Sequence, residues 1–273
     1  MNQQAKDYML GTSSEELDRL AYQHQVWAET TIDLWQRADF GPGQHILDLG
    51  CGPGFASLDL SRLTGPQGRV TGFDASQSFL RFLDSNAAAA GIENLDTRLG
   101  DVHQIQMDEN SIDRIFVRWL LCFVERPQQV ITEIQRLLRP GGRLAILDYF
   151  NYAAIRVCPH RDSIAALFKA YEASAVRNGG SYDIGAKLPA MISSAGLQLD
   201  ELVPVCRVGR SGSRLWHWVN LFNQSYIPKL LADKALDNQW KNRFDRDWAE
   251  LSADPAAFFF SPPMLGSVAS KPV

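Results

Sequence analysis

Short apolar runs alternate with stretches of helical periodicity between His45 and Asp148, and this alternation limits the possible folds more than any other feature of the chain. The first run, His45–Leu49, has the length and apolar character of a strand buried on both faces. Elements that alternate in this way form an α/β fold with a doubly wound, mostly parallel sheet and helices on both faces. The predicted strands are His45–Leu49, Arg69–Phe73, Leu95–Leu99, Ile112–Val117 and Arg143–Asp148, and the predicted helices between them are Ala56–Leu63, Gln77–Ala90 and Pro127–Leu138.

The segments on either side of this alternation are richer in helix. A capping-box pattern, Ser13 with Glu16, starts a predicted helical arm that ends near Phe40. Because the last predicted strand is interrupted by proline, we expect it at an edge of the sheet, which has seven strands in all. The later elements are helices over Asp162–Arg177 and up to Ala195, a strand over Leu197–Val208, a helical stretch over Ser213–Leu251 broken at Pro228, and a strand over Phe258–Ser270.

The length of 273 residues is about the ceiling for one hydrophobic core, and no low-complexity linker divides the chain. We therefore expect a single domain over residues 1–273. Its predicted parts are an N-terminal helical arm (1–40), a core (41–150), two helical lid inserts that follow the fifth and sixth strands (151–181 and 209–253), and segments that complete the sheet (182–208 and 254–273).

The charge balance disfavours nucleic acid as a partner. Lys and Arg number 27 and Asp and Glu 31, for a net charge of −4, so no basic field is available to hold a phosphate backbone. No stretch approaches the roughly 20 apolar residues of a membrane span. The segment Met1–Asp7 lacks the basic and apolar parts of a secretory signal, so we expect a cytoplasmic protein.

The four cysteines stand far apart and form no C-x-x-C pair. This spacing disfavours a zinc site and a disulfide framework, so we expect reduced thiols and no bound metal. The residues are Cys51, Cys122, Cys158 and Cys206.

The most informative segment is Leu47–Phe55, where a predicted strand runs directly into a Gly-x-Gly-x-Gly loop and then a helix. Gly50 and Gly52 lack the Cβ that would keep a ligand from the backbone, and the helix start presents free N–H groups. Tight turns also use glycine for geometry alone. A dinucleotide-binding loop has the longer spacing G-x-G-x-x-G, whereas Pro53 here removes an N–H donor. The loop therefore favours a nucleoside without phosphates.

Two carboxylates follow neighbouring predicted strands at the same edge of the sheet. Asp74 ends the second strand, where an acidic side chain can accept hydrogen bonds from both hydroxyls of a ribose. Asp101 follows the third strand and can accept from an exocyclic adenine amine. The alternative for Asp101 is that it only caps a turn.

In their order and spacing, four segments resemble those of the class I S-adenosylmethionine-dependent methyltransferases, particularly a small-molecule branch similar to ubiquinone and menaquinone methyltransferases. The resemblance implies a single methyltransferase domain with a Rossmann-like sheet, S-adenosyl-L-methionine as cofactor and S-adenosyl-L-homocysteine as product. The segments are Ile46–Phe55, Gly68–Ser76, Gly100–Val102, and Ile112–Leu121 leading to Leu138–Leu144.

The resemblance also implies which residues contact the cofactor. Gly50 and Gly52 would lie against its methionine part, Asp74 would hold the ribose, and Asp101 with the amide of Val102 would read adenine. The full set is Asp48, Gly50, Cys51, Gly52, Asp74, Ala75, Asp101, Val102, Val117 and Arg118, with Arg19, Tyr22 and Gln23 on the N-terminal helix as further candidates for the cofactor carboxylate or a lid. The alternative for the last three is one face of an exposed helix.

No catalytic base is identified by the sequence. Methyl transfer from a sulfonium is an in-line displacement of an already activated group, so orientation supplies much of the acceleration and a base is optional. The weak candidates are His103, Asp148, Tyr149 and His217. The alternative for His103 is that it packs beside adenine. The alternative for Asp148 and Tyr149 is that they only satisfy the hydrogen-bonding groups at the strand end, and the alternative for His217 is an ordinary core or surface position. Relatives often carry a histidine pair after the fourth strand, where this chain has Cys122 and Phe123.

The predicted substrate is a small, apolar or aromatic molecule, because both lid inserts leave from the ligand edge and carry aromatic side chains. These are Tyr152, Phe168, Tyr171, Trp216, Trp218, Phe222 and Tyr226, and packing of the lid onto the core is the alternative role. We expect a monomer or homodimer. Two other functions stay open: a non-catalytic cofactor-binding protein, and an RNA or protein methyltransferase, although the fourth strand lacks the Asn/Asp-Pro-Pro-Tyr loop of enzymes that methylate amines of nucleic acids.

Overall fold

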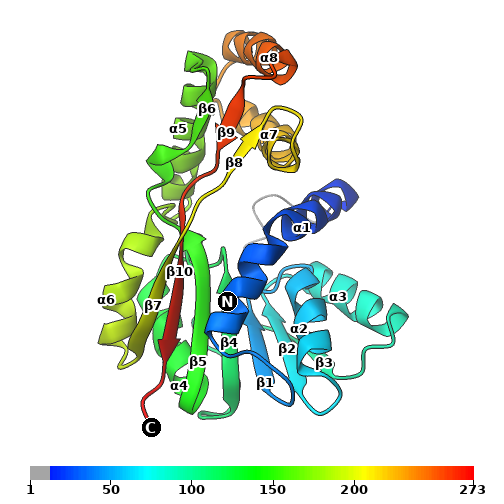
Figure 1. Ribbon diagram of the computed structural model, residues 1–273, viewed down its shortest axis with the longest axis vertical. Helices are drawn as coiled ribbons and strands as arrows, with labels where there is room; N and C mark the ends of the chain where they lie inside the picture. Colours follow the sequence, from blue (N-terminus) through cyan, green and yellow to red (C-terminus); the bar gives the residue numbers. More distant parts are fainter. Residues whose placement is uncertain (1–12) are drawn as a thin grey trace, which may run out of the picture.

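The computed structural model describes residues 13–273 and has a seven-stranded sheet at its centre (Figure 1). The strand order is β3-β2-β1-β4-β5-β10-β7. The first five of these strands are mutually parallel, and β10 runs antiparallel to both β5 and β7. The strands are β1 His45–Leu49, β2 Arg69–Asp74, β3 Leu95–Leu99, β4 Ile112–Arg118, β5 Leu138–Tyr149, β7 Gln198–Val205 and β10 Met264–Ser270. The predicted doubly wound, mostly parallel sheet is confirmed.

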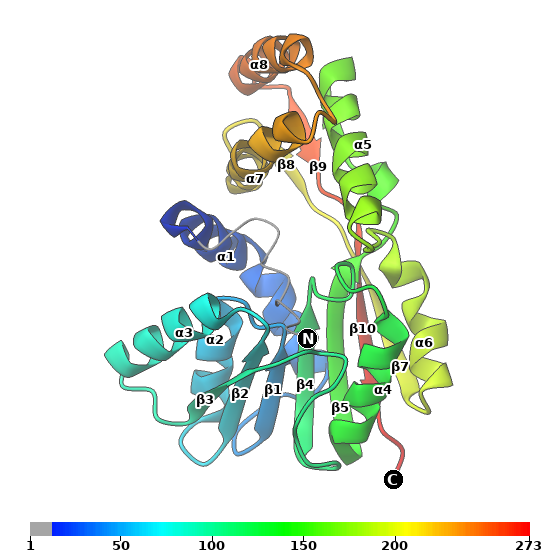
Figure 2. The same cartoon turned by 180° about the vertical axis from the view of Figure 1, so that it is seen from behind.

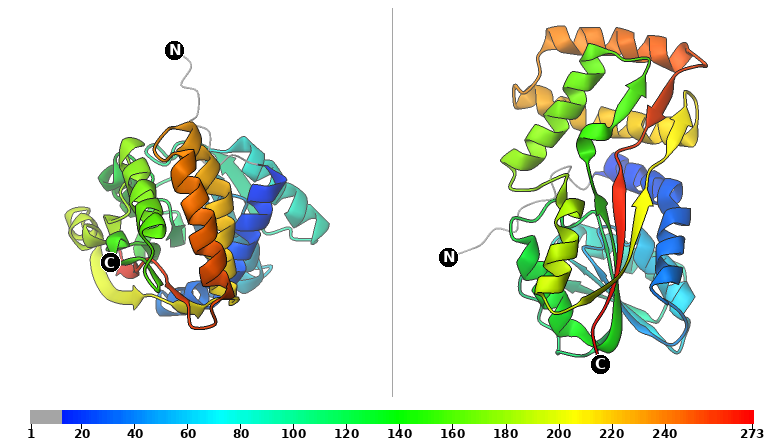
Figure 3. Two further views of the ribbon diagram at one scale, coloured as in Figure 1. Left: turned by 90° about the horizontal axis from the view of Figure 1, so that it is seen from above. Right: turned by 60° about the vertical axis from the view of Figure 1, so that its left-hand side comes forward.

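Helices cover both faces of this sheet (Figure 3). The first three lie on one face and α4 and α6 on the other, as expected when a parallel sheet is wound in both directions from its middle. Four of the five residues of β1 are fully buried between the two layers, because both faces of the strand are covered. The helices are α1 Ser14–Arg37, α2 Phe55–Thr64, α3 Gln77–Ala89, α4 Pro127–Leu137 and α6 Leu188–Ser194.

A second unit, here called the cap, lies beyond the carboxyl ends of the parallel strands (Figure 2). It consists of a small antiparallel sheet, ordered β6-β9-β8, and three helices that cover it. Short connections after β5 and β7 and before β10 join the cap to the main sheet. The cap elements are β6 Arg156–Cys158, α5 Asp162–Arg177, β8 Val208–Arg210, α7 Arg214–Ala232, α8 Asn238–Ala253 and β9 Phe258–Phe260.

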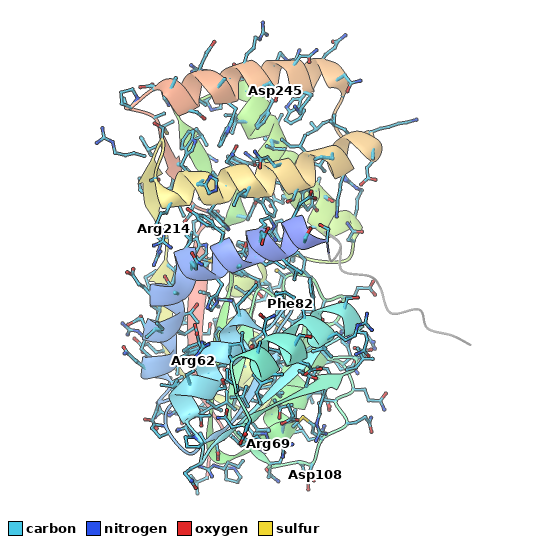
Figure 4. The ribbon with its side chains drawn as sticks, turned by 90° about the vertical axis from the view of Figure 1, so that its right-hand side faces the viewer. Arg62, Arg69, Phe82, Asp108, Arg214 and Asp245 are labelled. Carbon is cyan, nitrogen blue, oxygen red and sulfur yellow. The ribbon has the colours of Figure 1, made fainter. Side chains whose placement is uncertain are left out.

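Helix α1 lies between the cap and the main sheet, with α7 on one side and α2 on the other (Figure 4). Its start confirms half of the predicted capping box, because the Ser13 hydroxyl accepts a hydrogen bond from the amide of Glu16 at 3.3 Å. The Glu16 side chain instead pairs with Arg19 at 2.7 Å. The part of the predicted arm that precedes Ser13, and the segment Met1–Asp7, lie outside the described residues.

Three predictions about the last hundred residues are wrong. Helix α7 continues through Pro228, because buried side chains on both sides of the proline, Ile227 and Leu230, keep the helix packed against the rest of the cap. The predicted strand over Leu197–Val208 is divided between β7 and the cap strand β8.

The predicted last strand, Phe258–Ser270, is also divided, and its second half is not at an edge. Pro262 and Pro263 lie in the connection between β9 and β10, so every residue of β10 keeps its N–H donor. Strand β10 therefore pairs on both sides, and β7 takes the edge position.

Among the described residues, no helix combines the length and the apolar character needed to cross a membrane.

Two glycines with similar backbone angles provide a test of the packing between α3 and the glycine loop at the start of α2. Gly54 has φ +79°, and a Cβ there would lie 2.3 Å from the buried side chain of Leu83, whereas Gly43 has φ +76° and nothing within 4 Å. We expect Gly43→Ala to lower the free energy of unfolding by about 1 kcal/mol, the cost of the left-handed conformation alone. Gly54→Ala should lower it by at least about 2 kcal/mol, because overpacking adds to that cost. Urea denaturation measures both, and equal losses would contradict the packing described here.

Candidate functional site

The glycine loop after β1 lies at the edge of the sheet that faces the cap. The amides of Gly50 and Cys51 donate to the carbonyl of Phe73 at 2.8 and 3.1 Å, which ties the loop to the end of β2. Gly52 has φ +55°, and a Cβ built on it would meet nothing within 4 Å. The backbone at Gly52 is therefore open to a ligand, as a loop that approaches a nucleoside requires.

Asp74 fixes this loop from the end of β2. Its Oδ2 accepts from the amide of Gly52 and its Oδ1 from the amide of Ser76, both at 2.8 Å. Burial raises the pKa of Asp74, and the two backbone donors oppose that shift. Each carboxylate oxygen has a second lone pair, so the side chain still has acceptors for the two ribose hydroxyls. Ala75, which follows, is exposed.

Asp48, on β1, is a buried carboxyl beneath the loop. Its Oδ2 accepts from the hydroxyl of Ser57 at 2.6 Å. Burial raises its pKa to about 6, although the Ser57 hydrogen bond and the charge of Arg118 act in the opposite direction. Burial also raises the pKa of the neighbouring Cys51 thiol. The pair of Asp48 and Ser57 links β1 to the first turn of α2.

The side chain of Arg118, at the end of β4, joins three elements. It donates to the hydroxyl of Thr31 at 2.9 Å and to Nδ1 of His24 at 3.2 Å, both on α1. Nε2 of His24 lies 2.9 Å from a carboxylate oxygen of Asp59 on α2. Because a guanidinium has no acceptor, Nδ1 must be the acceptor, so His24 is the neutral tautomer that donates from Nε2. Burial lowers the pKa of Arg118 to about 10.

Asp101 and His103 form a pair after β3. Oδ1 of Asp101 accepts from the amide and from Nδ1 of His103, at 2.9 and 2.6 Å. The Asp101 side chain is 61% exposed, so it lies at the rim of the edge, and Val102 beside it is buried. Asp101 caps the turn with one carboxylate oxygen and leaves the other toward solvent. This geometry is compatible with both interpretations of Asp101, as a turn cap and as an acceptor for an adenine amine.

Arg19, Tyr22 and Gln23 face helix α7 of the cap. The Arg19 guanidinium lies 5.4 Å from the ring centre of Phe222. Oε1 of Gln23 accepts from the indole of Trp218 at 3.0 Å, and the Tyr22 hydroxyl donates to the carbonyl of Arg214 at 3.2 Å. These contacts connect α1 to the cap, so the three residues are not a solvated helix face.

Only two of the four weak catalytic candidates meet at the end of β5. Asp148 is fully buried and accepts from the amides of Cys122 and Tyr149, at 3.2 and 2.9 Å. Burial raises its pKa to about 6 and also raises the pKa of the Tyr149 hydroxyl. His103 lies at the Asp101 rim. His217 is exposed, with its ring 4.9 Å from that of Tyr22.

An apolar cleft, here called the aromatic cleft, lies between the end of β5 and the cap. Its free volume of about 10 Å³ is enough for about one water molecule, so the cleft is closed. It is lined by Tyr149, Tyr152, Ile155, Phe168, Tyr171, Trp218, Val219, Phe222, Phe259 and Pro262. Five of the seven aromatic residues predicted to face the substrate are in this lining. The other two, Trp216 and Tyr226, pack inside the cap against Trp248 and Tyr171.

Sequence reasoning missed Trp119, which follows β4 directly. Its φ of +50° is unusual for a bulky residue. This backbone conformation occurs where the chain turns away from the sheet edge after β4. Its ring lies 6.4 Å from that of Tyr149 and 6.2 Å from that of Trp27. The available signal was its position immediately after a predicted strand at the ligand edge. Within residues 13–273, no group of three His, Cys, Asp or Glu side chains is arranged to hold a metal ion.

Comparison with known families gives one match that covers most of the chain. A family model described as a methyltransferase domain matches residues 41–194. An uncharacterized 37.1 kDa protein in transposon TN4556 of Streptomyces fradiae is 29% identical over 81% of this chain and 65% of its own length. A demethylmenaquinone methyltransferase of Listeria monocytogenes is 30% identical over 46% of this chain and 52% of its own. The chain thus spans less than two thirds of the length of these curated relatives.

Solved structures share the fold at low sequence identity. Geranyl diphosphate C-methyltransferase from Streptomyces coelicolor superposes with a TM-score of 0.60 and 15% identity, over 99% of this chain and 88% of that one. A cyclase named SpnF superposes with a TM-score of 0.59 and 21% identity, over 90% of this chain and 81% of that one. These likenesses concern the fold alone.

The raised pKa of Asp48 predicts a dependence of stability on pH. In the folded protein the carboxyl keeps its proton up to about pH 6, whereas the unfolded chain releases it near pH 4. Its contribution to stability is therefore complete below pH 4 and is lost as the pH rises through 6. Asp48→Asn has no proton to lose, so its stability relative to wild type should improve by about 1–3 kcal/mol between pH 4 and pH 7. Urea denaturation at each pH measures this difference. A stability difference between Asp48→Asn and wild type that stays constant from pH 4 to pH 7 would refute the assignment.

Proposed function

The chain belongs to the methyltransferase domain family of class I S-adenosylmethionine-dependent methyltransferases, and on this premise we propose that it transfers a methyl group to a small, apolar or aromatic molecule. The observation that carries the proposal is the aromatic cleft, which ends at Tyr149, one residue after the buried carboxyl of Asp148 on β5. One strand, β4, separates this part of the sheet edge from the loop after β1 that would hold the cofactor. The acidic net charge supports a small molecule over nucleic acid as the substrate. We further propose that the protein acts in the cytoplasm, as a monomer or homodimer.

The residues at the sheet edge fit S-adenosylmethionine. The open backbone at Gly52 admits the methionine part, and Asp74 keeps lone pairs for the ribose hydroxyls. Asp101 has an oxygen toward solvent for the adenine amine. The carboxyls of Asp48 and Asp74 suit the positive charge of the cofactor, because a cation nearby favours their ionised forms. When bound, the cofactor supplies an activated methyl group.

The chain contributes orientation and exclusion of water. Aromatic walls from β5 and the cap would hold a flat substrate once they had moved apart to admit it, because the free volume of the cleft is only about 10 Å³, and they would then keep water away from it. Tyr149 remains protonated because burial raises the pKa of its hydroxyl, so it can donate a hydrogen bond and is a poor base. Both oxygens of Asp148 hold backbone amides, so we assign it to positioning the turn after β4. The reaction therefore depends on alignment more than on proton transfer.

Replacement of Asp74 tests the ribose assignment. Asp74→Ala removes a two-oxygen acceptor for the ribose, so affinity for S-adenosylmethionine should fall at least about tenfold. The control is Asp108→Ala, which removes an exposed carboxylate beside Arg136, in the segment between β3 and β4 at the end of the molecule opposite the cap (Figure 4). Isothermal titration calorimetry gives both affinities, and equal binding by wild type and Asp74→Ala would sink the assignment.

A transfer screen tests the reaction itself. Radiolabelled S-adenosylmethionine is incubated with quinones, phenols, amines and carboxylic acids, and label should appear on an aromatic or apolar acceptor. Phe222→Ala, in the cleft, should lower transfer about tenfold or more because it removes a wall of the substrate site. Phe82→Ala, on α3 beside Phe55, is the matched control and should retain transfer. Cofactor binding without label transfer to any class would instead favour a non-catalytic role.

A further inference from the structure

Arg118, at the end of β4, is a partly buried cation whose two hydrogen-bond partners are both neutral. They are the hydroxyl of Thr31 and the imidazole of His24. Within residues 13–273 no Asp or Glu forms an ion pair with Arg118, and the charges of Asp48 and Asp59 act on it only from a distance. Because a charge taken out of water is costly unless it is paired, this guanidinium favours an anionic partner.

The Arg118 guanidinium also has N–H groups to spare. It has five in all, and the two bonds to α1 leave three for a ligand. Nε makes no hydrogen bond within the described part of the chain, yet it is not among the enclosed polar atoms that lack a partner. A ligand can therefore reach Nε. The rings of Phe116 and Trp119, 5.9 and 5.0 Å from the guanidinium carbon, hold the group in place.

The register of the sheet places Arg118 beside the glycine loop. Leu49 of β1 pairs with Val117 of β4, so Gly50 and Arg118 are the next residues on the two adjacent chains. Asp48, beneath the loop, is close enough for the Arg118 charge to act on its carboxyl. A ligand that lies against Gly50 therefore has this guanidinium at its side.

The start of α2 adds positive partial charge to the same region. The ring of Phe55, the first residue of α2, lies 6.1 Å from the ring of His24, which accepts from Arg118. Gly54 at the N-cap has no side chain to accept from the first-turn amides, and the first turn holds no acidic residue. The helix dipole is therefore left uncompensated at this end, and it favours an anion there.

Arg19 is the other arginine that the sequence suggests for a cofactor carboxylate, and its charge is already paired. Its Nε and Nη2 donate to the two oxygens of Glu16 at 2.8 and 2.7 Å, and its Nη1 donates to Gln23 at 3.0 Å. The side chains of Arg19 and Glu16 are only 3% and 2% exposed. A second carboxylate would have to displace Glu16 and leave it buried without a partner, which is costly.

We propose that the side chain of Arg118 binds the carboxylate in the methionine part of S-adenosylmethionine. This inference rests on the proposed function and assigns one more group of its cofactor. The product carries the same carboxylate, so Arg118 determines affinity for cofactor and product alike. The guanidinium also holds Thr31 and His24, so the bound carboxylate and helix α1 share one cation.

The test compares S-adenosylhomocysteine with its primary carboxamide, a neutral group of nearly the same shape in place of the carboxylate. Both are titrated calorimetrically into the full chain, at a pH that keeps the amine of each ligand protonated. Wild type should bind the carboxylate form at least about tenfold more tightly. In Arg118→Gln the preference should fall to about twofold or less while the carboxamide binds nearly as before. A purely structural role would weaken both ligands alike.

Conservative and matched variants complete the test. Arg118→Lys keeps the charge without the planar group, so it should show an intermediate preference, and it decides the matter if Arg118→Gln does not fold. Arg19→Gln, the rival assignment, should keep the full preference. So should Arg114→Gln, which removes another arginine of β4 and leaves only the exposed Asp39 without its partner.

Equal affinity of wild type for the two ligands would overturn the inference, as would a full preference in Arg118→Gln or Arg118→Lys, or a loss of preference in Arg19→Gln. In all of these outcomes S-adenosylhomocysteine still binds, so the proposed function stands. Failure of wild type to bind either ligand would overturn the inference and the proposed function together.

Discussion

The parallel pairing of β1 with both β2 and β4 is the constraint on which the other features depend. The chain leaves these strands in different directions, so a crevice forms where their carboxyl ends meet. The glycine loop, Asp74 and Arg118 all lie at that edge because the loop follows β1, Asp74 ends β2 and Arg118 ends β4. The amide of Gly52 donates to Asp74 between the ends of β1 and β2, so the loop has a fixed shape before any ligand arrives. Preorganisation of this kind lowers the ordering cost of binding.

The sequence was sufficient for the parts of the fold in which local pattern and tertiary environment agree. The run His45–Leu49 is apolar because both faces of β1 are covered, and Asp74 could be assigned to the sheet edge because a parallel strand ends there. The glycines of the loop signalled their backbone conformation, since Gly50 and Gly52 both have positive φ. In each case the residue type matches what its own segment of backbone requires, so the sequence pattern alone indicates the structure.

The remaining features depend on contacts that no local pattern encodes. The network of Asp59, His24 and Arg118 joins three elements, and none of its residues looks unusual in its own segment. The cap sheet was missed because β8 and β9 have three residues each, too short for a period-two pattern to be recognised. The predicted helix break at Pro228 was wrong because tertiary packing of α7 outweighed the local penalty of the proline. The edge position of β10 was predicted from prolines that lie before the strand.

The three strands of the cap sheet come from three separate parts of the chain, each entering from a different strand of the main sheet or leading into one. None of these strands can pair until the main sheet has brought together the three connections that lead to the cap. We therefore expect the cap to form last, since pairing of β10 with β5 and β7 leaves only short connections to close before the cap strands can meet. The aromatic cleft has one wall on β5 and the other in the cap, so it comes into existence only at that final step.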